Sequence, residues 1–184
     1  MTEQLKKTTD PRMAWVSLSA LVVVAILFGL IALPRLSPRS KNEGHAATDF
    51  TLEVIHGGDP GNRIRLSDLL GKAVILDFWA SWCVPCREQM PIVDQVLQRF
   101  QDKGLVVVGI STNDIRDDAV TFLRSSTTSY ASVFDENSCV GVAYGVRALP
   151  TLVVIDRKGR VSAQRSGVLR EAELEELVQK AMRE

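Results

Sequence analysis

The longest hydrophobic run of the chain lies near its N-terminus. No residue from 14 to 33 is charged, and residues 21–31 are almost purely apolar. A helix needs roughly 20 such residues to cross a bilayer, so the run predicts a single membrane anchor at residues 14–33. The anchor divides the chain into an N-terminal cytoplasmic segment at residues 1–13, a polar linker at residues 34–47 and a folded domain at residues 48–184.

Two other interpretations of this run are a buried core helix and a cleavable signal peptide. Nothing precedes the run that could bury it, and a signal peptide usually has a shorter apolar region that ends in a small-residue cleavage site. Here the run is followed by Pro34 and Arg35, which make a poor cleavage site. Positive charges flank the run almost equally on both sides, so charge alone does not orient it. A short leader before a long domain favours placing that domain on the extracytoplasmic, periplasmic side of the cell (inner) membrane.

Hydrophobic periodicity in residues 48–184 predicts alternating strands and helices. Residues 50–55 alternate as a strand does and, with residues 63–66, predict a β-hairpin. The apolar runs at residues 73–79 and 105–110 suit strands buried on both faces. The other predicted elements are a helix that begins at about residue 83, helices at 117–125, more weakly at 137–144 and from about 170, and a strand hairpin at 151–155 and 160–164. This order predicts an α/β fold with a mixed sheet flanked by helices.

Composition limits the function. Lysine and arginine together equal aspartate and glutamate, and the net charge of zero argues against a nucleic-acid partner. Three cysteines are too few for a disulfide scaffold. Two of them, Cys83 and Cys86, are three residues apart, and this spacing is the informative feature.

The pair lies where a strand ends and a helix begins. The N-terminus of a helix stabilises a thiolate, which lowers the pKa of Cys83 and makes it a nucleophile. Cys86 lies on the same face and can close a disulfide with it. The pair would therefore act through a redox-active disulfide, with Cys83 attacking a partner disulfide and Cys86 resolving the product, and would need no other cofactor.

Other chemistry for these cysteines is less well supported. A structural zinc site needs two further ligands, and only Cys139 and two upstream histidines remain, so we predict no metal site. Two inert buried cysteines are the remaining structural interpretation. A thioredoxin-like copper chaperone, or a partner of metallochaperones, is the alternative function, because two thiolates can bind Cu(I). A peroxidase would need a peroxidatic cysteine in a Pro/Thr-rich loop, which the chain lacks.

The motif and its surroundings resemble a known family. Residues 74–87 read VILDFWASWCVPCR, residues 144–151 read YGVRALPT, and residues 154–159 read VIDRKG. Together they resemble the membrane-tethered TlpA/ResA/CcmG branch of the thioredoxin superfamily, from about residue 49 to the C-terminus. The resemblance implies a thioredoxin-like fold and thiol:disulfide oxidoreductase activity.

Several site residues follow from this resemblance. Pro150 matches the family's cis-proline, and Leu149 before it would offer its backbone to a substrate strand; an ordinary trans proline is the alternative. Asp77 matches the buried aspartate that acts as general base for the resolving cysteine, and its place in an apolar strand predicts a raised pKa. A strand-end aspartate satisfied by hydrogen bonds is the other interpretation of Asp77. Trp82, with Val84 and Pro85 of the motif, is expected to contact substrate.

The resemblance also implies partners. We expect a disulfide-containing exported protein as substrate, a membrane electron donor of the DsbD/CcdA type and a monomeric enzyme that reduces its substrate. Cytochrome c maturation is a candidate pathway, although Gln89 and Thr151 stand where relatives in that pathway carry glutamate. Cys139 is left unpaired and is expected to be a buried free thiol.

Overall fold

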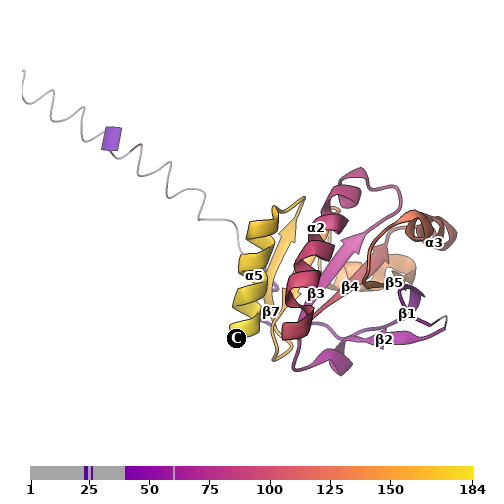
Figure 1. Cartoon of the computed structure of the whole chain (residues 1–184), viewed down its shortest axis with the longest axis horizontal. Coiled ribbons are helices and arrows are strands. Elements are labelled where there is room, and N and C mark those ends of the chain that lie inside the picture. Colours follow the sequence, from indigo (N-terminus) through magenta and orange to yellow (C-terminus); the bar gives the residue numbers. More distant parts are fainter. Residues whose placement is uncertain (1–22, 25, 27–39, 60) are drawn as a thin grey trace, which may run out of the picture. The chain divides into compact units, whose positions relative to one another are not determined.

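The computed structural model describes residues 23, 24, 26, 40–59 and 61–184. The folded domain lies within residues 39–184 (Figure 1). The predicted segment 1–13 and most of the predicted anchor lie outside the described residues. Within the described part of the chain, no helix is long and apolar enough to cross a membrane.

A seven-stranded mixed sheet forms the centre of the domain, in the order β2-β1-β5-β4-β3-β6-β7. Parallel pairing joins β3 to β4 and β4 to β5, and the other neighbours are antiparallel. The strands are β1 (Thr51–His56), β2 (Arg63–Arg65), β3 (Ala73–Trp79), β4 (Leu105–Thr112), β5 (Ala131–Asp135), β6 (Thr151–Ile155) and β7 (Val161–Ser166). The mixed sheet predicted from periodicity is therefore confirmed, and the N-terminal hairpin β1–β2 joins it through β5.

Helices cover both faces of this sheet. The α-helices of the domain are α2 (Val84–Phe100), α3 (Arg116–Ser125), α4 (Cys139–Ala143) and α5 (Glu171–Arg183). Short 3₁₀ helices are η2 (Leu66–Leu69), η3 (Gln101–Lys103) and η4 (Glu136–Ser138). Helices α2 and α5 lie side by side over one face (Figure 1).

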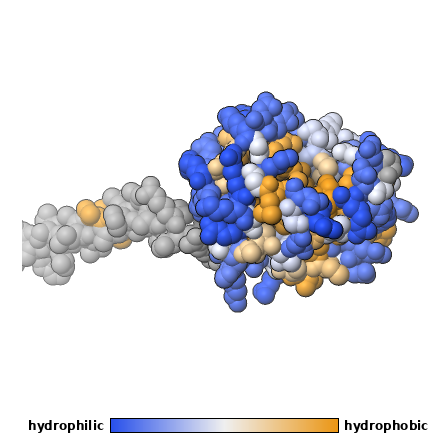
Figure 2. All heavy atoms as spheres, turned by 90° about the horizontal axis from the view of Figure 1, so that it is seen from below, coloured by the Kyte–Doolittle hydropathy of each residue, from blue (hydrophilic) through white to orange (hydrophobic). Residues whose placement is uncertain are grey.

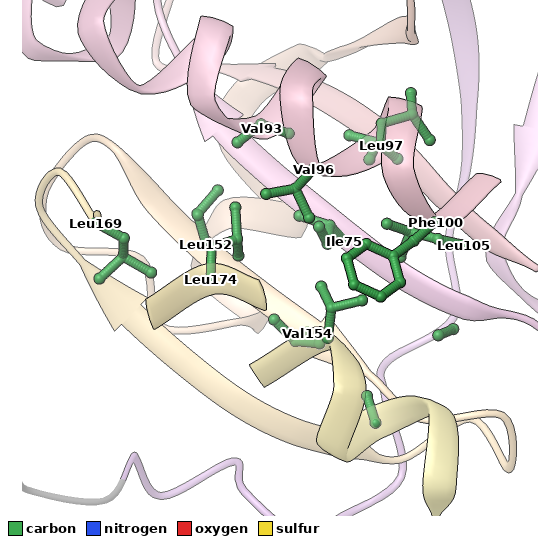
Figure 3. Packing of buried hydrophobic residues seen from close by; sticks show 14 of the residues in the cluster. Ile75, Val93, Val96, Leu97, Phe100, Leu105, Leu152, Val154, Leu169 and Leu174 are labelled. Atoms are coloured by element: carbon green, nitrogen blue, oxygen red, sulfur yellow. The ribbon is translucent and has the colours of Figure 1, made fainter. Parts of the chain in front are cut away.

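The core between α2, α5 and the sheet consists of buried hydrophobic side chains. Val93, Val96 and Phe100 of α2 pack with Leu174 of α5 and Ile75 of β3 (Figure 3). A second cluster fills the opposite face, where the rings of Phe78 and Tyr144 lie 5.7 Å apart. Successive residues of β3 alternate between these two clusters, as the two-residue period of a strand requires. Hydrophobic residues also appear between hydrophilic ones on the outer surface (Figure 2).

Residues 40–47, which the hydrophobic pattern assigns to the linker, lie along the start of β7. Gly44 N–H donates to Val161 O at 2.7 Å, and Val161 N–H donates to His45 O at 2.9 Å. Arg165 forms an ion pair with Glu43 at 2.6 Å. This segment therefore packs on the domain beside the last strand of the sheet.

One strand was missed by periodicity, and one predicted helix is shorter than expected. Strand β5 was not predicted, although it lies between β1 and β4. Strands β3 and β6 have the predicted bounds. The weak helix expected at residues 137–144 is only the five-residue α4, preceded by Asn137 and Ser138 with positive φ.

Candidate active site

Cys83 and Cys86 form a disulfide at the junction between β3 and α2, with their Cα atoms 5.4 Å apart. Strand β3 ends at Trp79, and the N–H of Cys83 donates to Ala80 O at 3.1 Å in the turn that follows. Cys83 is the N-cap of α2, and Pro85 lies in the first turn. Proline is tolerated there because its missing N–H would have no partner within the helix. The sequence therefore places both sulfurs at the N-terminus of a helix, as predicted.

The electrostatic setting favours a thiolate on Cys83. The N–H of Cys86 points to Cys83 Sγ at 3.3 Å, and the first turn of α2 contains no acidic residue. Unpaired N–H groups and the helix dipole give this end a partial positive charge. Both cysteines are buried, since Cys83 is 3% exposed and Cys86 is 1% exposed. A partner disulfide must therefore be brought to Cys83 by contacts around it.

Exposed apolar side chains flank the disulfide. Trp82 is 58% exposed and Val84 is 67% exposed, and Pro85 is also exposed. The indole N–H of Trp82 donates to Asn113 O at 2.9 Å, which fixes the ring at the end of β4. A cavity of about 260 Å³ adjoins this ring and is lined by residues that include Val142 and Leu149.

Leu149, which precedes Pro150, packs next to the disulfide. The Leu149–Pro150 peptide bond is cis, which confirms the conformation expected for Pro150. Leu149 packs against the hydrophobic cluster that contains Cys83 and Cys86. The structure thus places Leu149 beside the motif in one apolar cluster, although Leu149 lies 63 positions after Cys86 in the sequence.

Asp77 is buried in β3, on the face covered by α2. Burial raises the pKa of Asp77 to about 6, and a hydrogen bond from Tyr130 opposes part of that rise. The Tyr130 hydroxyl donates to Asp77 Oδ2 at 2.8 Å. Burial also raises the pKa of Tyr130 well above its usual value, so the phenol stays protonated and can donate. The raised pKa predicted for Asp77 from its apolar surroundings is confirmed.

Sequence reasoning missed three residues around the site. Tyr130 was not identified, and Asp114 and Asn113 were not singled out. The carboxylate of Asp114 accepts from Ser81 N–H through Oδ2 at 2.6 Å and from the Ser81 hydroxyl through Oδ1 at 2.7 Å, and so holds the turn before Cys83. Asn113 and Asp114 could have been identified, because they directly follow the apolar part of β4. Ligands bind beyond the carboxyl ends of parallel strands, so polar residues at this place are candidates for the site.

Cys139 is a correction to the sequence analysis. It is free and exposed, whereas a buried thiol was expected. Cys139 begins the short helix α4, and the next two residues, Val140 and Gly141, occupy the buried side instead. Among residues 23, 24, 26, 40–59 and 61–184, no group of three or more histidine, cysteine or acidic side chains could hold a metal ion.

Neutral side chains occupy the two positions where the family resemblance led us to expect glutamate. Gln89 is fully buried and accepts a hydrogen bond from Leu169 N at 2.6 Å. Thr151 is also fully buried, and its hydroxyl donates to Ala148 O at 2.7 Å. Both residues satisfy neighbouring backbone groups near the site and bring no charge to it.

Comparison with known proteins agrees with this geometry. Residues 44–164 match the model of the AhpC/TSA family. The thiol-disulfide oxidoreductase ResA of Halalkalibacterium halodurans is 29% identical, over 90% of this chain and 93% of that protein. ResA of Bacillus subtilis is 33% identical, over 72% of each chain. The crystal structure of Etrx1, the exposed lipoprotein thioredoxin of Streptococcus pneumoniae, is 25% identical with a TM-score of 0.62, and covers 72% of this chain and 99% of its own.

Proposed function

Because this chain belongs to the AhpC/TSA family and is a thiol-disulfide oxidoreductase of the ResA type, we propose that it reduces disulfides of exported proteins with Cys83 as the attacking nucleophile. The observation that carries this proposal is the Cys83–Cys86 disulfide at the N-terminus of α2. Cys83 is the N-cap of the helix and Cys86 lies within its first turn, which supports Cys83 as the residue that attacks.

The proposed reaction has two exchange steps. The Cys83 thiolate attacks one sulfur of the substrate disulfide, an S–S bond forms between enzyme and substrate, and the other substrate sulfur leaves as a thiolate. Cys86 then loses its proton to Asp77 and attacks Cys83 Sγ, which releases the second substrate thiolate. The substrate gains two electrons, and the enzyme is left with the Cys83–Cys86 disulfide. A carboxylate with a pKa of about 6 is suited to accept this proton near neutral pH.

We propose that the surface around Trp82 binds the substrate as a protein segment. Six large hydrophobic side chains of the described domain are exposed, and four of them surround the motif or line the hollows beside Trp82. These four are Trp82, Val84, Ile115 and Val142. Exposed apolar groups gathered at one site are typical of contact surfaces for other proteins. Pro85 and Leu149–Pro150 complete this surface next to the sulfurs.

The proposed location is the extracytoplasmic side of the cell membrane, with residues 14–33 as the anchor. The uncharged run at these residues supports the anchor, and the description of Etrx1 as an exposed lipoprotein supports an external domain. A reduced dithiol in an oxidising compartment requires a supply of electrons, which is the reason for proposing a membrane electron donor. Labelling of Cys139 in intact cells by a membrane-impermeant maleimide tests this location, and protection of Cys139 until lysis would contradict it.

A trapping experiment tests the proposed roles of the cysteines. The full chain carrying Cys86→Ser should accumulate mixed disulfides through Cys83, because the resolving step is removed. Cys83→Ser is the matched control and should trap nothing, and Cys139→Ser should behave as the parent does. Trapping by Cys83→Ser instead would reverse the assignment of the nucleophile.

The reduction potential tests the direction of electron flow. The reduction potential of thioredoxin is about −270 mV, and that of the strong oxidant DsbA is about −120 mV. We expect the Cys83–Cys86 disulfide to have a potential near that of thioredoxin when the full chain is equilibrated with a dithiol buffer. The identity of a trapped substrate then tests cytochrome c maturation as the pathway, which Gln89 and Thr151 do not favour.

A further inference from the structure

Asp77 has two oxygens with different surroundings. Oδ2 accepts the hydrogen bond from the Tyr130 hydroxyl at 2.8 Å, whereas Oδ1 is buried and has no hydrogen-bond partner among the described residues. A buried polar atom without a partner is uncommon and destabilising, and a catalytic role is one explanation for such an atom. We infer that Tyr130 is a positioning residue for the reaction: its hydroxyl holds Oδ2 of Asp77 and leaves Oδ1 as the oxygen that receives the Cys86 proton. This inference rests on the proposed role of Asp77 as the base.

Tyr130 reaches Asp77 from two strands away. Asp77 lies in β3, and Tyr130 immediately precedes β5, so the phenol ring must cross β4, which separates those strands. Gly109 of β4 is the register partner of Asp77 on one side and of Ser132 on the other. A Cβ atom on Gly109 would lie 3.2 Å from Tyr130 Cε2 and 2.5 Å from Ser132 Oγ. The absence of a side chain at Gly109 therefore lets the ring pass across the sheet.

A second contact fixes the segment that carries Tyr130. The N–H and hydroxyl of Ser129 both donate to Asp94 Oδ1 of α2, at 2.9 and 2.6 Å. Helix α2 is also the element that carries Cys86. The phenol is thus held between the helix of the resolving cysteine and the carboxyl group that serves it.

Few charged groups act on this carboxyl. Tyr130 is the titratable group that contacts it, and Asp94 affects it indirectly by raising the pKa of Tyr130. The neighbours of Asp77 in β4 and β6 are Gly109 and Leu152, which carry no charge. The buried face of α5 is apolar, and α2 contributes the two active-site sulfurs. The hydrogen bond from Tyr130 is therefore the main interaction that stabilises the carboxylate form of Asp77.

Tyr130→Phe removes this hydrogen bond and keeps the ring. The carboxylate form loses a bond of the charge-assisted kind, so the midpoint of Asp77 titration should rise by roughly 1 to 2 pH units. Tyr144→Phe is the matched control, because the hydroxyl of Tyr144 is also a buried donor but bonds to Thr48 O at 2.8 Å, and its ring lies in the cluster on the opposite face of the sheet.

The resolving step can be followed with an aromatic disulfide that releases a coloured thiolate, such as Ellman's reagent. The reduced full chain, in detergent and carrying Cys139→Ser, releases one thiolate when Cys83 attacks and a second when Cys86 resolves. We expect the second release in Tyr130→Phe to be roughly three- to 25-fold slower at pH 6.5 and to approach the parent rate above pH 8.5. The first release should change little, and Tyr144→Phe should match the parent throughout. Recovery at high pH would indicate a shifted titration, which a merely structural defect would not produce.

A readout independent of activity is the infrared carbonyl stretch of protonated Asp77, identified by its loss in Asp77→Asn. Its midpoint should move upward in Tyr130→Phe and stay in place in Tyr144→Phe. If Asp77→Asn abolishes the pH dependence of the second release but Tyr130→Phe leaves both midpoints unchanged, the inference about Tyr130 is overturned while the base role stands. If Asp77→Asn retains the pH dependence of the second release, the base role itself is wrong and the inference falls with it.

Discussion

Replacing Asp77 by asparagine should make the stability of the oxidised protein less dependent on pH. The pKa of Asp77 is about 6 in the folded protein, against an ordinary value of 3.8. A group with a raised folded pKa contributes stability that is fully present below its unfolded pKa and is lost as the pH rises through its folded pKa. Asp77 should therefore destabilise the fold progressively between pH 3.8 and about pH 6.

The size of this effect follows from the two pKa values. The difference between about 6 and 3.8 is about 2 units, and one unit corresponds to about 1.4 kcal/mol, so the loss at neutral pH is about 3 kcal/mol. Between pH 4 and pH 7.5 the change should be about 2 to 3 kcal/mol, because the unfolded group is already partly ionised at pH 4. An asparagine amide in the same place cannot ionise, so the variant avoids this loss.

Urea unfolding of the full chain in detergent, followed by circular dichroism at a series of pH values, measures the effect. The stability difference between Asp77→Asn and the parent should move in favour of the variant by about 2 to 3 kcal/mol from pH 4 to pH 7.5. An asparagine amide without hydrogen-bond partners lowers the free energy of unfolding of the variant by the same amount at every pH, so it does not alter this trend. Asp102→Asn removes a charge from the exposed η3 and serves as the control. A difference that stays constant across this pH range would refute the assignment of a buried, titrating carboxyl.

Three further outcomes are expected. Gly109→Ala should destabilise the fold by about 1 to 3 kcal/mol, since its Cβ would lie 2.5 Å from Ser132 Oγ, and Ser132→Ala in the same chain should restore part of the loss in urea unfolding. The oxidised protein should react with one equivalent of Ellman's reagent without denaturant, because Cys139 is exposed, and Cys139→Ser should abolish this reaction. Trp82→Ala should lower kcat/KM for a protein disulfide severalfold and leave the unfolding midpoint nearly unchanged, because the ring is 58% exposed; equal loss with a small disulfide would argue against a docking role.

The central strands and the motif could be predicted because local sequence determines them. Strand β3 is an uninterrupted apolar run, and the turn at residues 156–159 sets the boundary of β6. Strand β5 escaped prediction because its five residues include Ser132 and Asp135 and show no clear period. Its burial comes from the neighbouring strands β1 and β4, which is a tertiary effect.

In the active site too, features set by adjacent residues could be predicted, and features that depend on distant residues could not. The sequence was sufficient to predict the raised pKa of Asp77, because the apolar neighbours of Asp77 are adjacent in the chain. It was not sufficient to identify Tyr130, which is 53 residues away and reaches Asp77 only through the order of strands in the sheet. The exposure of Cys139 likewise depends on which side of a five-residue helix meets the core.

The two borders of the sheet are both protected against pairing with another molecule. Strand β2 has only three residues, and its two arginines are exposed, which discourages a further strand from adding there. At the other border, the backbone of Gly44 and His45 occupies hydrogen-bonding groups at the start of β7. The unpaired strands of a protein substrate of the kind proposed above would find little opportunity to add to the sheet at these borders. The surface around Trp82, next to the sulfurs, would then be left as the place of contact.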